Sequence, residues 1–136
     1  MRPFNQRELE NKTDLCVRMR NNVTELIDQN QETLYSFGYD QSFWSFDNFS
    51  EKENGILVKK TEDSSYVDQQ EVYDKLGKEV VQNALQGYNC CVFAYGQTGS
   101  GKSYSVFGYE NNQGIIPLFC KDIFEQISQQ SSESSF

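Results

Sequence analysis

The glycine-rich run at residues 96–103 constrains this chain more than any other feature. It reads Gly96-Gln97-Thr98-Gly99-Ser100-Gly101-Lys102-Ser103 and fits the pattern G-x-x-x-x-G-K-[ST]. The nearly all-apolar residues 90–95 come directly before it. Such a run predicts a strand that is buried on both faces in a parallel sheet. Strand, glycine turn and helix start therefore occur in the order that a phosphate-binding P-loop requires.

The residue types in this run suit a polyphosphate ligand. A nucleoside triphosphate is a dense anion, and a sharply turning backbone aims successive N–H groups at it, helped by the positive end of the next helix. Gly96, Gly99 and Gly101 permit that turn. We predict that Lys102 reaches the β and γ phosphates and that the Ser103 hydroxyl ligates Mg²⁺. The alternative is a flexible glycine-rich connection without a ligand.

Composition limits the size and the partners of this stretch. The chain has 136 residues, of which 24% are charged and 37% hydrophobic, which fits one globular domain or a piece of one. Its net charge is −8, with 12 basic residues against 20 acidic ones. This balance argues against nucleic acid or an anionic membrane as a partner of this stretch. The sequence contains no run of eighteen apolar residues, so we expect no direct membrane insertion. Because residues 1–8 are polar and charged, unlike a secretory signal, we expect a soluble, intracellular protein.

Cysteine and histidine usage narrows the chemistry further. Cys16, Cys90, Cys91 and Cys120 lack the spacing of a metal site, and two of them fall in the predicted buried strand. We therefore expect reduced core cysteines rather than disulfides. Histidine is absent, which excludes histidine-based acid, base or metal chemistry within these residues.

The first half of the chain predicts short strands and loops. Residues 16–20 and 23–28 alternate apolar and polar side chains, with Asn21-Asn22 as the turn of a hairpin. Residues 33–39 predict an aromatic-rich strand, followed by more aromatic side chains at residues 43–46. We expect these aromatic side chains to pack in a core, the alternative being stacking on a ligand. The polar residues 47–67 predict a surface loop with one brief strand at residues 56–58.

The second half predicts helices. A capping box at Asp68 and Glu71 opens a helix over residues 69–86, which ends at Gly87. Its expected buried stripe comprises Val72, Leu76, Val80, Val81 and Leu85.

Two further helical segments follow the glycine-rich run. A helix that begins at Lys102 breaks at Gly108, residues 109–114 form a loop, and Pro117 lies in the first turn of the next segment. Residues 129–136 are low in complexity and predict a mobile tail.

Four blocks of this sequence resemble kinesin motor domains and occur in the order of that family. They are GYNCCVFAYGQTGSGKSY at residues 87–104, RPFNQRE at 2–8, YSF with FWS at 35–45, and GIIP at 114–117. The resemblance implies that residues 1–136 are the N-terminal part of a kinesin motor domain. Its fold is α/β, a P-loop NTPase with a central, mostly parallel sheet flanked by helices. The residues in these blocks, especially Lys102-Ser103-Tyr104 and Phe43-Trp44-Ser45, are most similar to those of the third kinesin class, whose members carry cargo along microtubules.

The same resemblance implies roles for individual residues. Residues 97–103 would wrap the phosphates of ATP, with Mg²⁺ on Ser103. Arg2 and Pro3 would border the adenine, and Tyr104 would stack on it from the opposite side. The alternatives are a solvated chain end for Arg2 and Pro3, and ordinary helix packing for Tyr104.

The resemblance also indicates what these residues lack. Kinesins position the attacking water and sense the γ-phosphate with "NxxSSRSH" and "DLAGSE" elements, and neither occurs in the sequence. We therefore expect nucleotide binding without hydrolysis, whereas a complete motor would hydrolyse ATP and move along microtubules (tubulin) in the cytoplasm. One alternative is a truncated, non-motile kinesin-like interaction protein associated with microtubules. Another, an unrelated P-loop NTPase such as a small kinase, explains neither residues 2–8 nor residues 114–117.

Overall fold

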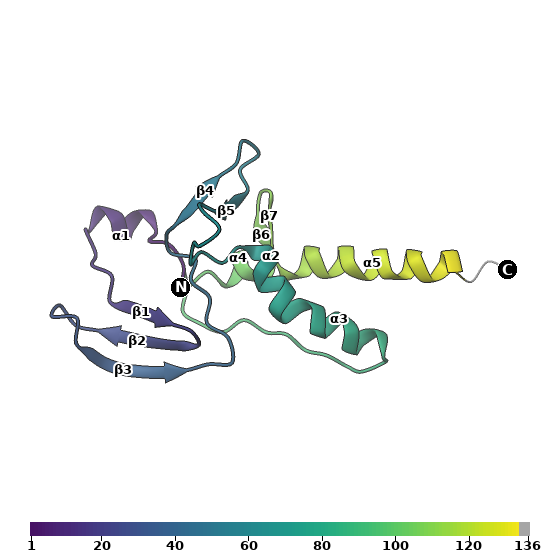
Figure 1. The fold of residues 1–136 in the computed structure, drawn as a ribbon, viewed down its shortest axis with the longest axis horizontal. Helices are drawn as coiled ribbons and strands as arrows, with labels where there is room; N and C mark the ends of the chain where they lie inside the picture. The colour runs from purple at the N-terminus through teal and green to yellow at the C-terminus, as the bar shows by residue number, and fades with distance from the viewer. Residues whose placement is uncertain (134–136) are drawn as a thin grey trace. The chain divides into compact units, whose positions relative to one another are not determined.

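The structure is a computed structural model that describes residues 1–133 (Figure 1). The chain divides into two compact units, and each is described by itself. Unit one comprises Met1–Phe49 and Lys59–Val67. Unit two comprises Ser50–Val58 and the described residues from Asp68 onward.

Unit one contains an antiparallel sheet in the order β1-β2-β3. Its strands are β1 (Val17–Arg20), β2 (Val23–Ile27) and β3 (Thr33–Gly38). Asn21 takes a left-handed φ of 52° in the turn between β1 and β2, a conformation that asparagine tolerates better than most residues. The predicted hairpin and the predicted third strand are therefore both confirmed.

The aromatic core expected in this unit is only partly formed. Phe4, Trp44 and Phe46 are half-buried and pack edge to face, with ring centroids 4.9 Å apart for Phe4 and Phe46 and 5.6 Å for Trp44 and Phe46. Tyr35 and Phe37 stack on each other but remain 63% and 44% exposed. All six residues of β3 are exposed, so within unit one no second layer covers that strand. The expectation of core packing was wrong for Tyr35 and Phe37.

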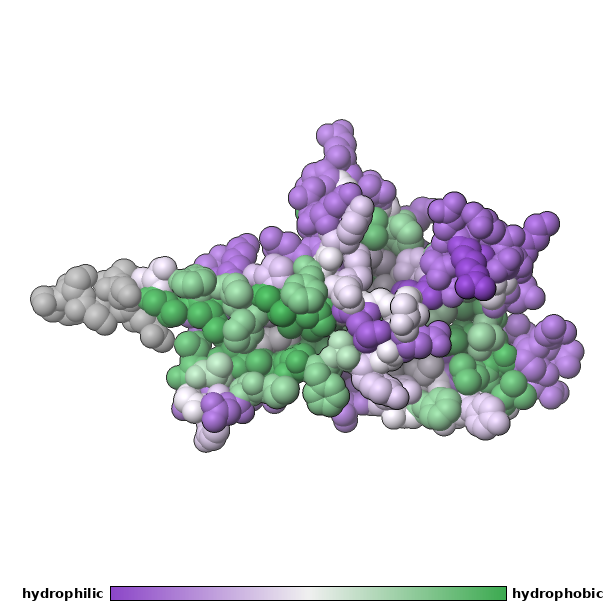
Figure 2. All heavy atoms as spheres, turned by 180° about the vertical axis from the view of Figure 1, so that it is seen from behind, coloured by the Kyte–Doolittle hydropathy of each residue, from purple (hydrophilic) through white to green (hydrophobic). Residues whose placement is uncertain are grey.

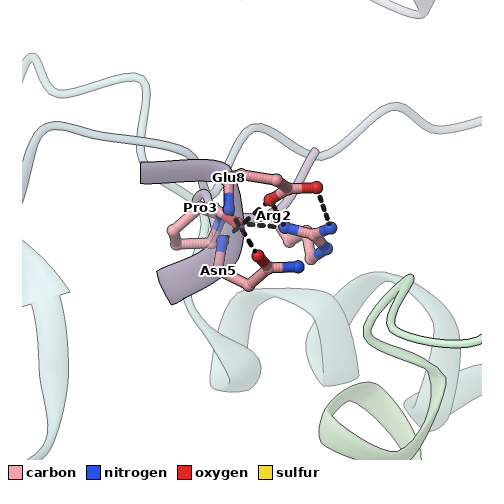
Figure 3. Close-up of polar contacts among 4 residues, drawn as sticks. All are labelled: Arg2, Pro3, Asn5 and Glu8. Carbon is pink, nitrogen blue, oxygen red and sulfur yellow. Dashed lines mark hydrogen bonds and ion pairs between the residues drawn. The ribbon is translucent and has the colours of Figure 1, made fainter. Parts of the chain in front are cut away.

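A short helix, α1 (Gln6–Glu10), is held by a cap and an ion pair (Figure 3). The Asn5 side chain accepts the Glu8 N–H at 2.9 Å, and the Glu8 carboxylate accepts the Asn5 N–H at 2.8 Å. The Arg2 guanidinium donates to both Glu8 carboxylate oxygens, at 2.7 and 2.8 Å. A helix of this length is not stable alone, so these contacts define it. The Arg2 hydrogen bond, followed by the one from Asn5, lowers the pKa of Glu8 from 4.5 to about 2.

Unit two is built around one continuous helical stretch that contains a π segment. Its parts are α2 (Gln69–Val72), η1 (Tyr73–Gly77) and α3 (Lys78–Leu85). The Asp68 carboxylate caps the start by accepting the Glu71 N–H at 2.8 Å, and Gly87 follows the end with a φ of 87°. The predicted helix is confirmed in extent, but the π segment was not predicted.

The π segment changes which side chains are buried. The buried face runs through Tyr73, Gly77 and Val81, whereas Leu76 and Leu85 of the predicted stripe are 41% and 42% exposed. A π turn rotates the following residues about the axis relative to regular α spacing, so a stripe assigned by α periodicity is displaced. The predicted stripe is therefore wrong at these two leucines.

The core of unit two joins this helix to α5 (Ile115–Glu133). Tyr73, Val81 and Leu118 form the buried cluster, with Phe119 and Ile123 packed against it. Pro117 lies in the first turn of α5, as predicted. The helix continues to Glu133, into the segment 129–136 for which a mobile tail is predicted. Extension of an anchored helix needs no new nucleation, and glutamine and serine tolerate it. Residues 134–136 lie outside the described residues.

The two predicted loops contain short strand pairs. β4 (Phe49–Glu51) pairs with β5 (Leu57–Lys59), and β6 (Gly108–Tyr109) pairs with β7 (Asn112–Gln113). The Asn112 side chain accepts the Leu57 N–H at 2.9 Å and donates to the Gly55 carbonyl at 2.8 Å, which ties the two segments together.

The apolar residues 90–95 do not form the predicted buried strand. Val92, Phe93 and Tyr95 are 54%, 83% and 95% exposed, and no strand pairs with residues 90–95 among those that the structure describes. A strand needs neighbours for its backbone hydrogen bonds, and the pairs β1–β2, β2–β3 and β6–β7 are all antiparallel and lie elsewhere in the sequence. The parallel sheet of the expected fold is thus not assembled within the described residues.

Exposed apolar surface extends beyond that segment. Figure 2 shows apolar side chains gathered along α5, and Ile116, Phe124 and Ile127 are 44%, 68% and 46% exposed. The cysteines Cys16, Cys90, Cys91 and Cys120 are free, as predicted, but all four are exposed. Their assignment to the core is therefore wrong, because the strand that was to bury two of them has no covering layers.

Replacing Gly77 with alanine tests the π segment. A Cβ at this position would lie 2.2 Å from the Tyr73 ring, so the ring would have to move. Overpacking typically costs about 1–3 kcal/mol, which exceeds the roughly 1 kcal/mol by which helices favour alanine over glycine. We expect Gly77→Ala to lower the urea midpoint of the 222 nm circular dichroism signal. In a Tyr73→Ala background, Gly77→Ala should no longer lower the urea midpoint. An equally large decrease in that background would show that the clash with the Tyr73 ring is not its cause.

Acidification should release α1 through Glu8. The pKa of this carboxyl in the folded chain, about 2, lies below its ordinary value of 4.5. Its contribution to stability is therefore present above pH 4.5 and is lost as the pH falls through about 2. An NMR titration of the side-chain carboxyl should show the low midpoint in the parent chain. In Arg2→Gln the midpoint should move toward 4.5, and an unchanged midpoint would rule out the Arg2 pair as its main cause.

Candidate phosphate-binding site

The glycine-rich loop of unit two adopts a backbone that side chains would obstruct. Gly96, Gly99 and Gly101 have φ values of 152°, 81° and 97°, in the region that glycine enters most readily. A Cβ on Gly96 would lie 2.7 Å from the Ser100 hydroxyl oxygen. The Ser100 N–H donates to the Gln97 carbonyl at 3.2 Å and closes the turn around Thr98. The three glycines thus permit the turn, as their positions in the sequence predict.

A short helix, α4 (Lys102–Val106), begins where the loop ends. Its N-cap residue, Gly101, supplies no side-chain hydrogen bond, so the first backbone N–H groups of α4 have no side-chain acceptor at the cap. Ser103 is exposed in the first turn. Its hydroxyl is one oxygen ligand, whereas Mg²⁺ takes most of its ligands from phosphates and water in nucleotide sites. Among the described residues no cluster of three or more acidic, cysteine or histidine side chains is placed to hold a metal.

The Lys102 ammonium lies against its own loop. Its Nζ atom donates to the carbonyl oxygens of Gly96 at 2.8 Å and Gln97 at 2.7 Å. Both acceptors are neutral, and an ammonium group forms stronger hydrogen bonds with anionic oxygens. The loop therefore brings exposed backbone amides and one positive charge together, which is the chemistry of a polyanion site.

Tyr104 follows in the same helix and is half-buried. Burial raises the pKa of its phenol, and the nearby Asp68 carboxylate adds to this. Its backbone carbonyl accepts a hydrogen bond from the Gln69 side-chain amide at 2.5 Å. Gln69 was not among the predicted site residues. No signal in the sequence links it to the loop, because the contact joins residues 35 positions apart.

Arg2 and Pro3 belong to unit one, and the Arg2 guanidinium is held by Glu8 and by the Pro3 carbonyl at 2.5 Å (Figure 3). The chain end is also fixed: the Met1 amino group donates to the Phe43 carbonyl, and the Met1 carbonyl accepts the Ser45 N–H at 2.9 Å. Arg2 is therefore held in place, while Pro3 is exposed to solvent. Their contact with adenine stays a prediction.

No helix among the described residues has the length and apolar character needed to cross a membrane.

A cavity of about 310 Å³ in unit two lies beside Gln69 and Asn112, and none of the loop residues 96–103 lines it.

Comparison with known proteins gives one consistent family. The family model of the kinesin motor domain matches residues 1–136. Kinesin-related protein 1 of Dictyostelium discoideum is 40% identical over 146 residues, which cover 99% of this chain and 6% of that protein. Kinesin-like protein KIF1C of Homo sapiens is 39% identical over 141 residues, which cover 100% of this chain and 12% of that protein.

Solved structures agree with the sequence matches. A KIF14 dimer in a two-heads-bound state, with AMP-PNP and in complex with a microtubule, matches with a TM-score of 0.78 at 40% identity. The match covers 95% of this chain and 32% of that chain, so the present residues span about a third of the solved motor chain. The expected P-loop NTPase fold of the kinesin motor domain is thereby confirmed. The chain belongs to the kinesin motor domain family.

Proposed function

We propose that this chain is the ATP-binding portion of a microtubule motor and that residues 96–103 hold the phosphates of ATP with Mg²⁺. The observation that carries the proposal is the loop itself. Three glycines at positive φ form a turn, and the Lys102 ammonium lies 2.8 and 2.7 Å from two of its carbonyl oxygens. Backbone amides and one ammonium group suit an anion of several oxygens better than any other ligand class.

Each site residue then has a defined task. Lys102 exchanges its two carbonyl partners for phosphate oxygens, and the Ser103 hydroxyl ligates Mg²⁺. Tyr104 stacks on the adenine. Arg2 and Pro3 border the adenine in the same proposal; the Arg2 guanidinium is paired with Glu8, and Pro3 is exposed. Mg²⁺ would supply charge neutralisation at the bound phosphates.

For the whole protein we infer hydrolysis of ATP coupled to movement along microtubules, and hence a place on the cytoplasmic cytoskeleton. The match to a KIF14 dimer with AMP-PNP in complex with a microtubule supports both the nucleotide and the partner. The amino acids at residues 43–45 and 102–104 support membership of the third kinesin class.

A second candidate is a non-motile, kinesin-like interaction protein associated with microtubules. It is favoured by one observation: neither "NxxSSRSH" nor "DLAGSE" occurs in the sequence. A protein without these elements elsewhere would hold nucleotide as a structural ligand. The transcript that encodes this chain decides between the two candidates, since the motor requires both elements downstream.

Lys102→Ala should weaken binding of MgATP in an isothermal titration. A hydrogen bond to a charged group contributes about 1.5–3 kcal/mol, which corresponds to roughly 10–100-fold in affinity. Lys121→Ala is the matched control, because Lys121 is exposed on α5 and only loosely paired with Glu125, 3.9 Å away. It should bind like the parent chain. Equal affinity of the Lys102 variant and the parent would remove the phosphate role of Lys102.

The described chain should bind nucleotide without turning it over. Phosphoryl transfer requires groups that orient the attacking water and sense the γ-phosphate, and the loop supplies neither. Phosphate release measured with a coupled assay should stay at the rate of buffer alone, with or without microtubules. Phosphate release that Lys102→Ala abolishes would contradict this expectation, because it would show catalysis by these residues.

A further inference from the structure

The helix that follows the phosphate loop is too short to define its own position. α4 (Lys102–Val106) has five residues and is separated from α5 by the β6–β7 hairpin. In a helix this short almost every carbonyl lies in the last turn, where regular partners are lacking. Contacts from other elements must therefore hold α4, and with it Lys102 and Ser103.

One such contact comes from the start of α2. The Gln69 side-chain amide donates to the Tyr104 carbonyl at 2.5 Å, where it acts as a cap from outside the helix. Within α4, that carbonyl is otherwise approached by the Phe107 N–H at the C-terminal end. Gln69 is half-buried, whereas its neighbour Gln70 is exposed and bonds to Asp74 on its own helix at 3.1 Å.

The helical segment that carries Gln69 is itself held in place. Asp68 caps α2 immediately before Gln69 by accepting the Glu71 N–H at 2.8 Å. One helical turn later the Tyr73 hydroxyl donates to the Asp122 carboxylate of α5 at 2.7 Å. Residues four positions apart lie on one face of a helix, so Gln69 and Tyr73 use the same face. A single helical element thus holds α4 and α5 on the two sides of the interruption at β6–β7.

We propose that Gln69 is a positioning residue of the phosphate loop, which keeps Lys102 and Ser103 in register by holding the Tyr104 carbonyl. The proposal rests on the proposed nucleotide function and adds a residue outside the motif to it. Without the amide donor, the end of α4 frays. The ligand then has to order the loop on binding, which lowers its affinity.

The chemistry of the contact sets the choice of variants. Gln69→Met keeps the length and shape of the side chain but removes the donor. Gln69→Lys keeps a donor at similar reach and should restore most of the affinity that Gln69→Met loses. Gln70→Met is the matched control, since it makes the same change one residue away without touching α4.

The first measurement is hydrogen exchange in the nucleotide-free chain. In Gln69→Met the amides of residues 105–107 should exchange about fivefold faster than in the parent, the equivalent of one neutral hydrogen bond. Amides of α3 should be unaffected, and Gln70→Met should match the parent throughout. Unchanged exchange at residues 105–107 would overturn the proposal, because the Gln69 amide would then not stabilise α4.

The second measurement is the affinity for MgATP and for magnesium pyrophosphate, which probes the loop without adenine. Both affinities should fall about fivefold in Gln69→Met and recover in Gln69→Lys, while both variants keep the parent's 222 nm signal at the temperature of the titration. Faster exchange with unchanged affinities would reduce Gln69 to a structural contact and overturn the positioning role. If the parent chain binds neither probe, the proposed nucleotide function is overturned as well. That outcome appears without any change at residue 69, so it can be told apart from failure of the Gln69 proposal alone.

Discussion

The Tyr73 side chain is the constraint on which the structure of unit two depends. It is 3% exposed, lies against Gly77 where no Cβ would fit, and donates its hydroxyl to Asp122 of α5. Burial and the Asp122 carboxylate raise the pKa of this phenol, so the hydroxyl remains a donor at any physiological pH. One side chain thereby fixes the π turn, the buried face of the helix and the place of α5 against it.

The elements predicted correctly are those specified by local chemistry. Asn21 in the turn of the hairpin, Asp68 at the helix start and Gly87 at its end all act on their immediate neighbours. The glycines of the phosphate loop belong to the same class, because positive φ is a property of a single residue. The approximate extent of the helix between Asp68 and Gly87 could therefore be predicted, and so could the turn of the glycine-rich loop at residues 96–103.

The elements missed depend on partners that are distant in sequence or lie outside the described residues. The π segment follows from a tyrosine ring and a glycine one turn apart, which α periodicity does not indicate. Residues 90–95 have the composition of a buried strand, but burial requires neighbouring strands, and the described residues supply none for them. The Gln69 contact with Tyr104 is likewise invisible in the sequence. The loop is consequently anchored on its helix side and open on its strand side.

The Lys102 contacts with its own loop have a consequence for which anions can enter. Any incoming anion must replace two hydrogen bonds that the ammonium already makes, at 2.8 and 2.7 Å. Chloride offers a single acceptor atom, whereas adjacent phosphoryl groups present several charged oxygens at once. The Lys102 contacts would therefore favour an anion with several oxygens over a monatomic anion.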